Sequence, residues 1–280
     1  MAYTTILLHC DKSRTLRARA AVAADFAGRF GAHVVGLHVR PRFETPMFTD
    51  GGMAMDSLYE AYDREMKAGE AEASAVFRQA MQGDKIFSEW RAVGGYIDEA
   101  VSEAALGADL VIVGQADTED SASATPSDLA EQVALRSGRP VLVLPHVGVQ
   151  RPPGARVMIC WNNSREAARA VTGALPLLAK ASRVEMLVID GEKATDAERE
   201  RSSGKGVIAW LGRHGVKAAL VRDTAPASAV GTAILSRAAD HDIDLIVMGL
   251  YGHSRMREMV LGGTSRTLLG SMTVPVLMAH

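Results

Sequence analysis

Cysteine and long apolar runs are scarce in this sequence of 280 residues. The two cysteines, Cys10 and Cys160, offer neither a disulfide framework nor the ligand spacing of a zinc site. No apolar run approaches the ~20 residues that a bilayer-spanning helix needs. The first residues also lack the basic segment that opens a signal peptide. We therefore expect a reducing compartment, no metal site and no membrane partner.

Aromatic residues and an excess of charge of one sign are also scarce. Aromatics make up 5% of the chain, so Ala, Val, Leu, Ile and Met must supply the core. Such a core suits helices packed on a sheet better than an all-β sandwich. The formal net charge of −2 provides no basic surface for nucleic acid. The remaining composition, 48% apolar and 23% charged, is that of a soluble globular protein.

Short β-branched runs alternate with Ala-rich stretches of helical spacing along the whole chain. Strands are predicted over residues 5–10, 34–39, 87–91, 109–113 and 140–144, and again over 156–160, 184–189, 218–222, 244–248 and 275–278. Helices are predicted between them, among others over 16–30, 59–82, 97–106, 165–179 and 229–239. This alternation is typical of α/β domains with a parallel sheet.

The second half of the chain repeats the plan of the first. Residues 109–114 (DLVIVG) correspond to 244–249 (DLIVMG) at an offset of 135, and the sequence PVL recurs at the same offset near each end. At the start of the halves, residues 11–14 (DKSR) correspond to 162–165 (NNSR) at an offset of 151. The first half therefore carries 16 extra residues. We expect them in a loop from Pro41 to about Met55.

The repeat predicts two tandem domains, residues 1–147 and 154–280. Each is expected to hold a five-stranded parallel sheet with helices on both faces, and the segment between them contains two prolines flanked by glycines, as linkers do. The closing strands, 141–144 and 276–278, are apolar, and each would leave a sheet edge open in its own domain. We expect these two strands to pair, so that the domains form an intramolecular pair.

Glycines cluster directly after the predicted strand 244–248. Gly249, Gly252 and Gly262 are spaced as G-x2-G-x9-G, and Gly263-Thr264-Ser265 then opens a helical stretch. Glycines allow a backbone to approach a ligand closely, and the free N–H groups of a helix N-terminus bind phosphate. The carboxyl end of a parallel strand is also where open α/β sheets bind ligands. This segment therefore predicts a phosphate-binding loop.

These residues resemble the universal stress protein family. The glycine spacing looks like the family's ATP-binding signature, and Gly252-His253-Ser254-Arg255, Val274-Pro275-Val276-Leu277 and the segment 161–167 (WNNSREA) are similar to the family as well. The resemblance covers both halves and matches the tandem-domain type. It implies a sheet of the adenine-nucleotide-binding kind and a cytoplasmic stress-response protein, often dimeric, which leaves a homodimer open.

The predicted nucleotide site lies in the second half. It comprises Cys160, Asn162, Val188, Met248, Gly249, Gly252, His253, Arg255, Gly262, Gly263, Thr264 and Ser265. The ligand expected there is ATP or a related adenine nucleotide, with Mg²⁺ or Mn²⁺. The chain departs from the family pattern at two positions: Gly263 stands where Ser or Thr is usual, and Asn162 stands where Asp is usual.

The first half lacks the corresponding loop. At the offset of 135, Gly252 corresponds to Asp117 and Gly262 to Ser127. Residues 253–266 hold three arginines and one glutamate, whereas residues 118–131 hold four carboxylates and no arginine. We expect this first loop to repel phosphate. The retained Asp11 is then expected to be structural, or the N-cap of the helix that it precedes.

Three functions remain open at this point. The first is a regulatory module that binds nucleotide in its second half, and the second is an interaction or structural protein of the same fold without nucleotide. The third is an enzyme of a related ATP-using α/β class. We find no catalytic residue beside the glycine loop, so we expect at most slow hydrolysis of ATP.

Overall fold

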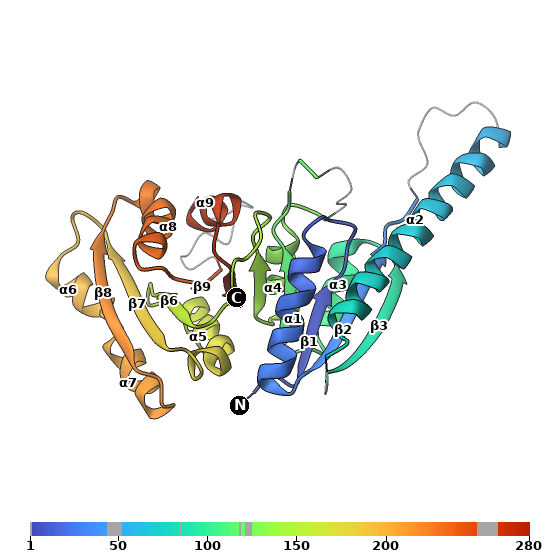
Figure 1. Cartoon of the computed structure of the whole chain (residues 1–280). Helices are drawn as coiled ribbons and strands as arrows, with labels where there is room; N and C mark the ends of the chain where they lie inside the picture. The colour runs from blue at the N-terminus through green and yellow to red at the C-terminus, as the bar shows by residue number, and fades with distance from the viewer. Residues whose placement is uncertain (1, 44–51, 84–85, 118, 121–124, 251–262) are drawn as a thin grey trace.

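A computed structural model describes the chain except for residues 1, 44–51, 84–85, 118, 121–124 and 251–262. The strands that it describes form one ten-stranded sheet in the order β3-β2-β1-β4-β5-β10-β9-β6-β7-β8 (Figure 1). Their bounds are β1 Thr5–His9, β2 His33–Arg40, β3 Phe87–Gly94, β4 Leu110–Gly114, β5 Val141–Leu144, β6 Arg156–Cys160, β7 Arg183–Asp190, β8 Ala218–Thr224, β9 Leu245–Gly249 and β10 Val276–Ala279. Each predicted strand is confirmed, to within a few residues at its ends.

Helices cover both faces of this sheet, as the sequence predicts. Their bounds are α1 Leu16–Phe30, α2 Gly52–Ala80, α3 Ile97–Ala105, α4 Leu129–Ser137, α5 Arg165–Leu178, α6 Asp196–Arg201, α7 Lys205–Arg213, α8 Val230–Asp240 and α9 Gly263–Ser271, with a single 3-10 turn at Ala227–Ala229. Side chains of α1, α2, α5 and α7 join the core on one face. Those of α3, α4, α8 and α9 join the core on the other. Along β4, for example, Ile112 faces the first core while Val111 and Val113 face the second.

The two halves meet through their closing strands. β5 and β10 pair antiparallel, with Leu142 opposite Leu277, whereas every other neighbouring pair in the sheet is parallel. The expected pairing of the closing strands is therefore confirmed. Both leucines are fully buried, so the joint is part of the core. Each strand covers the edge that the other would leave open.

The predicted loop from Pro41 to about Met55 is wrong at its far end. Helix α2 begins at Gly52 and runs for 29 residues, so residues 52–55 are helical. The segment after Gly52 is rich in Met, Ala, Leu and Glu, which are good helix formers. The helix therefore begins before Tyr59, the start that the sequence predicts. As a result, the N-terminal part of α2 extends beyond the sheet (Figure 1). Among the described residues, no helix is both long and apolar enough to cross a membrane.

Candidate functional site

Four of the predicted site residues lie at the carboxyl ends of neighbouring strands. Cys160 is in register with Leu187 on β7 and with Met248 on β9, which places Val188 and Gly249 one position further along. Val188 and Met248 are buried, and Cys160 is half-buried. Burial raises the pKa of the Cys160 thiol to about 12, so the group is neutral at physiological pH. Val188 packs into the core on the α5 side of the sheet, whereas Met248 and Cys160 face the core on the other side.

A polar turn connects β6 to α5 directly after Cys160. The side-chain oxygen of Asn162 accepts hydrogen bonds from the backbone N–H of Ser164 at 3.3 Å and from its hydroxyl at 2.7 Å. The Ser164 hydroxyl oxygen in turn accepts from the N–H of Ala167 at 3.1 Å and so caps α5. Asn163 between them has a φ of 58°, a conformation that Asn tolerates well. Asn162 is exposed and shapes the first turn of α5.

Gly249 is required by the packing of α5. A Cβ atom at this position would lie 2.4 Å from the backbone N of Ala167 and 2.6 Å from the carbonyl carbon of Glu166. The first turn of α5 therefore rests directly on the end of β9. The close neighbour at Gly249 is therefore this helix, and the approach of a ligand that the sequence predicts there stays a prediction.

The last three predicted residues begin helix α9. Gly263 is exposed, Thr264 is half-buried and Ser265 is buried. A Cβ atom on Gly231 of α8 would lie 3.3 Å from the carbonyl oxygen of Thr264, so α8 and α9 pack closely. The first turn of α9 holds backbone N–H groups that have no partner within the helix. The predicted residues Gly252, His253, Arg255 and Gly262 lie outside the described residues.

The corresponding place in the first half is filled by a buried ion pair. Asp11 follows β1 as Asn162 follows β6, and its carboxylate contacts the guanidinium of Arg19, whose side chain is 1% exposed. The same carboxylate accepts from the hydroxyls of Ser13 and Thr125, both at 2.6 Å. Burial would raise the pKa of Asp11, but Arg19 and these hydrogen bonds hold it far below its usual range.

Asp11 is thus structural, one of its two expected roles. The N-cap position of α1 is held by Thr15, so the alternative role as N-cap is wrong. The Arg19 guanidinium lies over the end of β4, because a Cβ atom on Gly114 would fall 2.3 Å from its Nη1. At the offset of 151 the second half has Ala170 in place of Arg19. The carboxyl end of the second sheet half therefore lacks both charges of this pair.

Sequence reasoning missed Arg19 and also Trp161. Trp161 follows β6 directly and is 6% exposed, and its indole N–H has no acceptor within the part of the chain that the structure describes. Gly204, in the left-handed conformation at φ 66°, approaches this ring. The internal repeat pairs Arg19 with Ala170, but it also pairs the exposed Arg17 with Ala168, so it does not single out Arg19.

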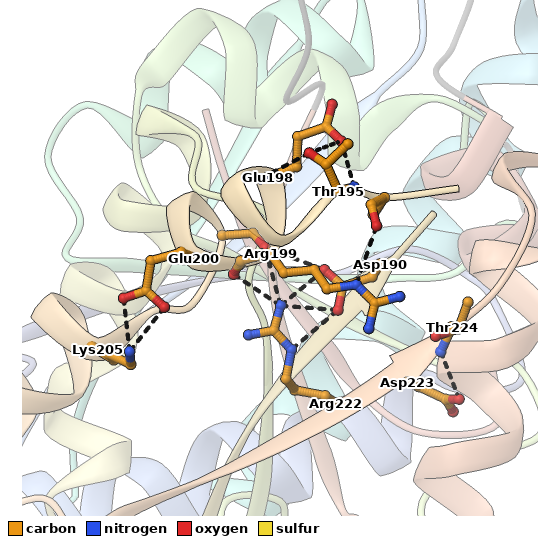
Figure 2. A network of polar contacts seen from close by, with 11 residues as sticks. Asp190, Thr195, Glu198, Arg199, Glu200, Lys205, Arg222, Asp223 and Thr224 are labelled. Atoms are coloured by element: carbon orange, nitrogen blue, oxygen red, sulfur yellow. Dashed lines mark hydrogen bonds and ion pairs between the residues drawn. The ribbon is translucent and has the colours of Figure 1, made fainter. Parts of the chain in front are cut away.

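A second polar network holds α6 beside the ends of β7 and β8 (Figure 2). Arg222 of β8 donates from Nε and Nη2 to the carboxylate of Asp190 at 2.9–3.1 Å, and Nη2 also donates to the carbonyl oxygen of Arg199 at 3.0 Å. Thr195 and Glu198 form a capping box at the start of α6. Because these groups satisfy one another, we assign the network a structural role.

Metal-binding groups are not assembled in the described part of the chain. No three side chains of His, Cys, Asp or Glu come together there in a way that would hold an ion.

Comparisons with known proteins agree with this architecture. The model of the universal stress protein family matches residues 2–145 and again residues 155–280. A universal stress protein of Synechocystis is 44% identical over 45 residues, a match that spans 16% of each protein.

Solved structures show the same fold over the whole chain. A universal stress protein from Archaeoglobus fulgidus superposes with a TM-score of 0.73 at 18% identity, covering 98% of this chain and 97% of that one. A putative universal stress protein from Pseudomonas aeruginosa superposes with a TM-score of 0.58 at 16% identity, covering 99% and 93%. The chain therefore belongs to the universal stress protein family and carries two of its domains in tandem.

Proposed function

We propose that this protein is a stress-response regulator that binds ATP or a related adenine nucleotide in its second half. The observation that carries the proposal is the difference between the halves. The first half fills the carboxyl end of its sheet with the Asp11–Arg19 ion pair, and the second half has Asn162 and Ala170 at those positions. The second half also carries the glycine signature between β9 and α9.

The described residues suit the parts of a nucleotide in different ways. Cys160 at the end of β6 is half-buried and provides apolar surface for a base, and the exposed side chain of Asn162 provides polar groups for a ribose or a base edge. The first turn of α9 provides backbone N–H groups and the Thr264 hydroxyl for phosphate. Because these groups bind the ground state and the described residues add no positioned base, hydrolysis is slow or absent.

The test is titration calorimetry with ATP, together with mass spectrometry of nucleotide that copurifies under mild conditions. Gly252→Val and Gly262→Val should abolish binding, since both remove a glycine of the signature. Ser127→Val, at the position that corresponds to Gly262 in the first half, should leave binding unchanged. Equal loss in all three variants, or a wild-type protein that binds no adenine nucleotide, would contradict the proposal.

An interaction protein of the same fold without nucleotide is the second candidate. Two observations favour it: the Asn162 side-chain oxygen is already engaged by Ser164, and Gly263 supplies no hydroxyl. On this alternative the wild-type protein copurifies without nucleotide, and calorimetry shows no heat of binding for ATP, ADP or AMP.

A further inference from the structure

The turns that follow β1 and β6 share a pair of hydrogen bonds, although Asn163 has a positive φ and its counterpart Lys12 does not. In the first half, the carboxylate of Asp11 accepts from the backbone N–H of Ser13 at 3.1 Å and from its hydroxyl at 2.6 Å. In the second half, Asn162 accepts the same two hydrogen bonds from Ser164. The next residue is an arginine in both halves, and the two arginine side chains are similarly exposed, 60% for Arg14 and 63% for Arg165. Arg14 and Arg165 therefore follow the same pair of hydrogen bonds, although Arg165 is the first residue of α5 and Arg14 lies two residues before α1.

In the first half this arginine binds an anion that the chain itself supplies. The Nη2 of Arg14 donates to the carboxylate of Asp117 at 2.6 Å, and its backbone N–H donates to the carboxylate of Asp120 at 3.0 Å. The Asp117 side chain is 7% exposed, so its charge is largely removed from water beside the arginine. The acidic loop of the first half is thus bound to the end of its own sheet.

Among the described residues of the second half, Arg165 has no counterpart of the Asp117 carboxylate. At the offset of 135, Asp117 corresponds to Gly252, which has no side chain to offer. The Nε of Arg165 donates to the carboxylate of Glu166, and within the described residues its Nη groups have no further partner. Glu166 therefore holds the guanidinium by one edge and leaves two N–H-bearing nitrogens for an external anion.

We propose that Arg165 binds the phosphates of the nucleotide, in the place where Asp117 binds Arg14 in the first half. The inference rests on the proposed function. It implies that Arg165 lets the protein distinguish a nucleotide from a nucleoside, which has no phosphate. A guanidinium matches the geometry of a phosphate as it does that of a carboxylate. In the first half, the carboxylate of Asp117 makes the corresponding contact with Arg14.

The experiment is calorimetric titration of the full-length protein with ATP and, separately, with adenosine. Arg165→Ala should weaken ATP by about 10–100-fold, because a hydrogen bond to a charged group is lost, and should leave adenosine within about twofold. Arg165→Lys should restore part of the ATP affinity. Arg14→Ala, the matched change in the first half, should leave both ligands unaffected. In Arg165→Ala the ATP affinity should also depend less on salt concentration.

One further variant separates binding from a structural effect. If Arg165 acted only by neutralising Glu166, then adding Glu166→Gln to Arg165→Ala would restore the ATP affinity, whereas direct binding predicts that the double variant stays as weak as Arg165→Ala. Equal loss for ATP and adenosine, or no loss in Arg165→Ala, would overturn the inference and leave the proposed function standing. A wild-type protein that binds neither ligand would overturn both.

Discussion

Arg19 has the largest of the fully buried side chains in the described structure, and the carboxylate of Asp11 balances its charge. Its Nη1 also donates to the hydroxyls of Ser13 and Thr15, at 3.0 and 2.8 Å. A buried ion pair of this kind adds little net stability over apolar residues, but removal of one member leaves a charge without compensation. The two members are thus expected to be strongly coupled in folding.

Arg19→Ala should reduce the free energy of unfolding by about 3–5 kcal/mol, because Asp11 is left buried and unpaired. The double variant Asp11→Asn with Arg19→Ala reproduces the residues of the second half, Asn162 and Ala170, and should recover part of this loss. Urea unfolding of wild type, both single variants and the double variant gives the coupling energy. Additive effects would show that the pair does not act as a unit.

His9 makes the stability of the fold depend on pH in the mildly acidic range. The side chain is 1% exposed, and burial lowers its pKa to about 4 from the ordinary 6.5, although the nearby Asp11 opposes the shift. The remaining charged or titratable neighbours, Arg19 and His38, lower it further. Because the unfolded chain then binds a proton more tightly than the folded one, this contribution is complete above pH 6.5 and is lost as the pH falls towards 4.

Wild type should therefore lose about 2 kcal/mol more than His9→Cys between pH 7 and pH 5. Cysteine is the residue that the second half has at this position, Cys160. Urea unfolding at both pH values measures the difference. An equal pH dependence in the two proteins would show that His9 is not buried in its neutral form.

At the scale of elements, the two halves pack their first helix differently. In the second half a Cβ on Gly249 would meet the backbone of α5, whereas in the first half a Cβ on Gly114 would meet the end of the Arg19 side chain. The backbone of α5 cannot shift away from an added Cβ atom without loss of packing along the whole helix. The end of a side chain has more freedom, even where it is buried.

Gly249→Ala should thus cost about 1–3 kcal/mol, the usual range for a group forced into a filled site, and Gly114→Ala should cost less. Thermal unfolding followed by circular dichroism compares the two variants. A larger loss in Gly114→Ala would mean that the Arg19 network is more rigid than the contact between α5 and β9.

At the scale of the molecule, the joint between β5 and β10 turns two five-stranded sheets into one. Leu142 and Leu277 lie opposite each other and are both fully buried in the core under α1 and α5. Apolar side chains on facing strands of an antiparallel pair stabilise it jointly. The two halves are therefore expected to unfold together.

Leu142→Ala and Leu277→Ala should each cost about 2–5 kcal/mol, and the double variant should show a coupling energy of about 0.5–3 kcal/mol. Leu142 paired with Leu211 of α7 serves as the control. Leu211 is also fully buried, but α7 packs against β8, and four strands lie between β5 and β8 in the sheet. Urea unfolding that shows equal coupling in both pairs would contradict a specific contact across the joint.

The strands, the helices that lie between them and the pairing of the closing strands could be predicted from the sequence alone. Buried strands of a parallel sheet are continuous apolar runs, and runs such as 109–114 and 244–249 carry this signal in a few neighbouring residues. Pairing of β5 with β10 followed because an apolar closing strand needs a partner. Because the second half repeats the first, the sequence supports each strand prediction twice, once in each half.

The tertiary structure decided which polar residues enter the core. Arg19 lies in an Ala-rich helical stretch with Arg17, and nothing local distinguishes the two. Its burial depends on Asp11 after β1, on Gly114 at the end of β4, and on Thr125, which hydrogen-bonds Asp11 from 114 residues away. A buried charge is stable only where such distant partners converge, and convergence is a property of the folded chain.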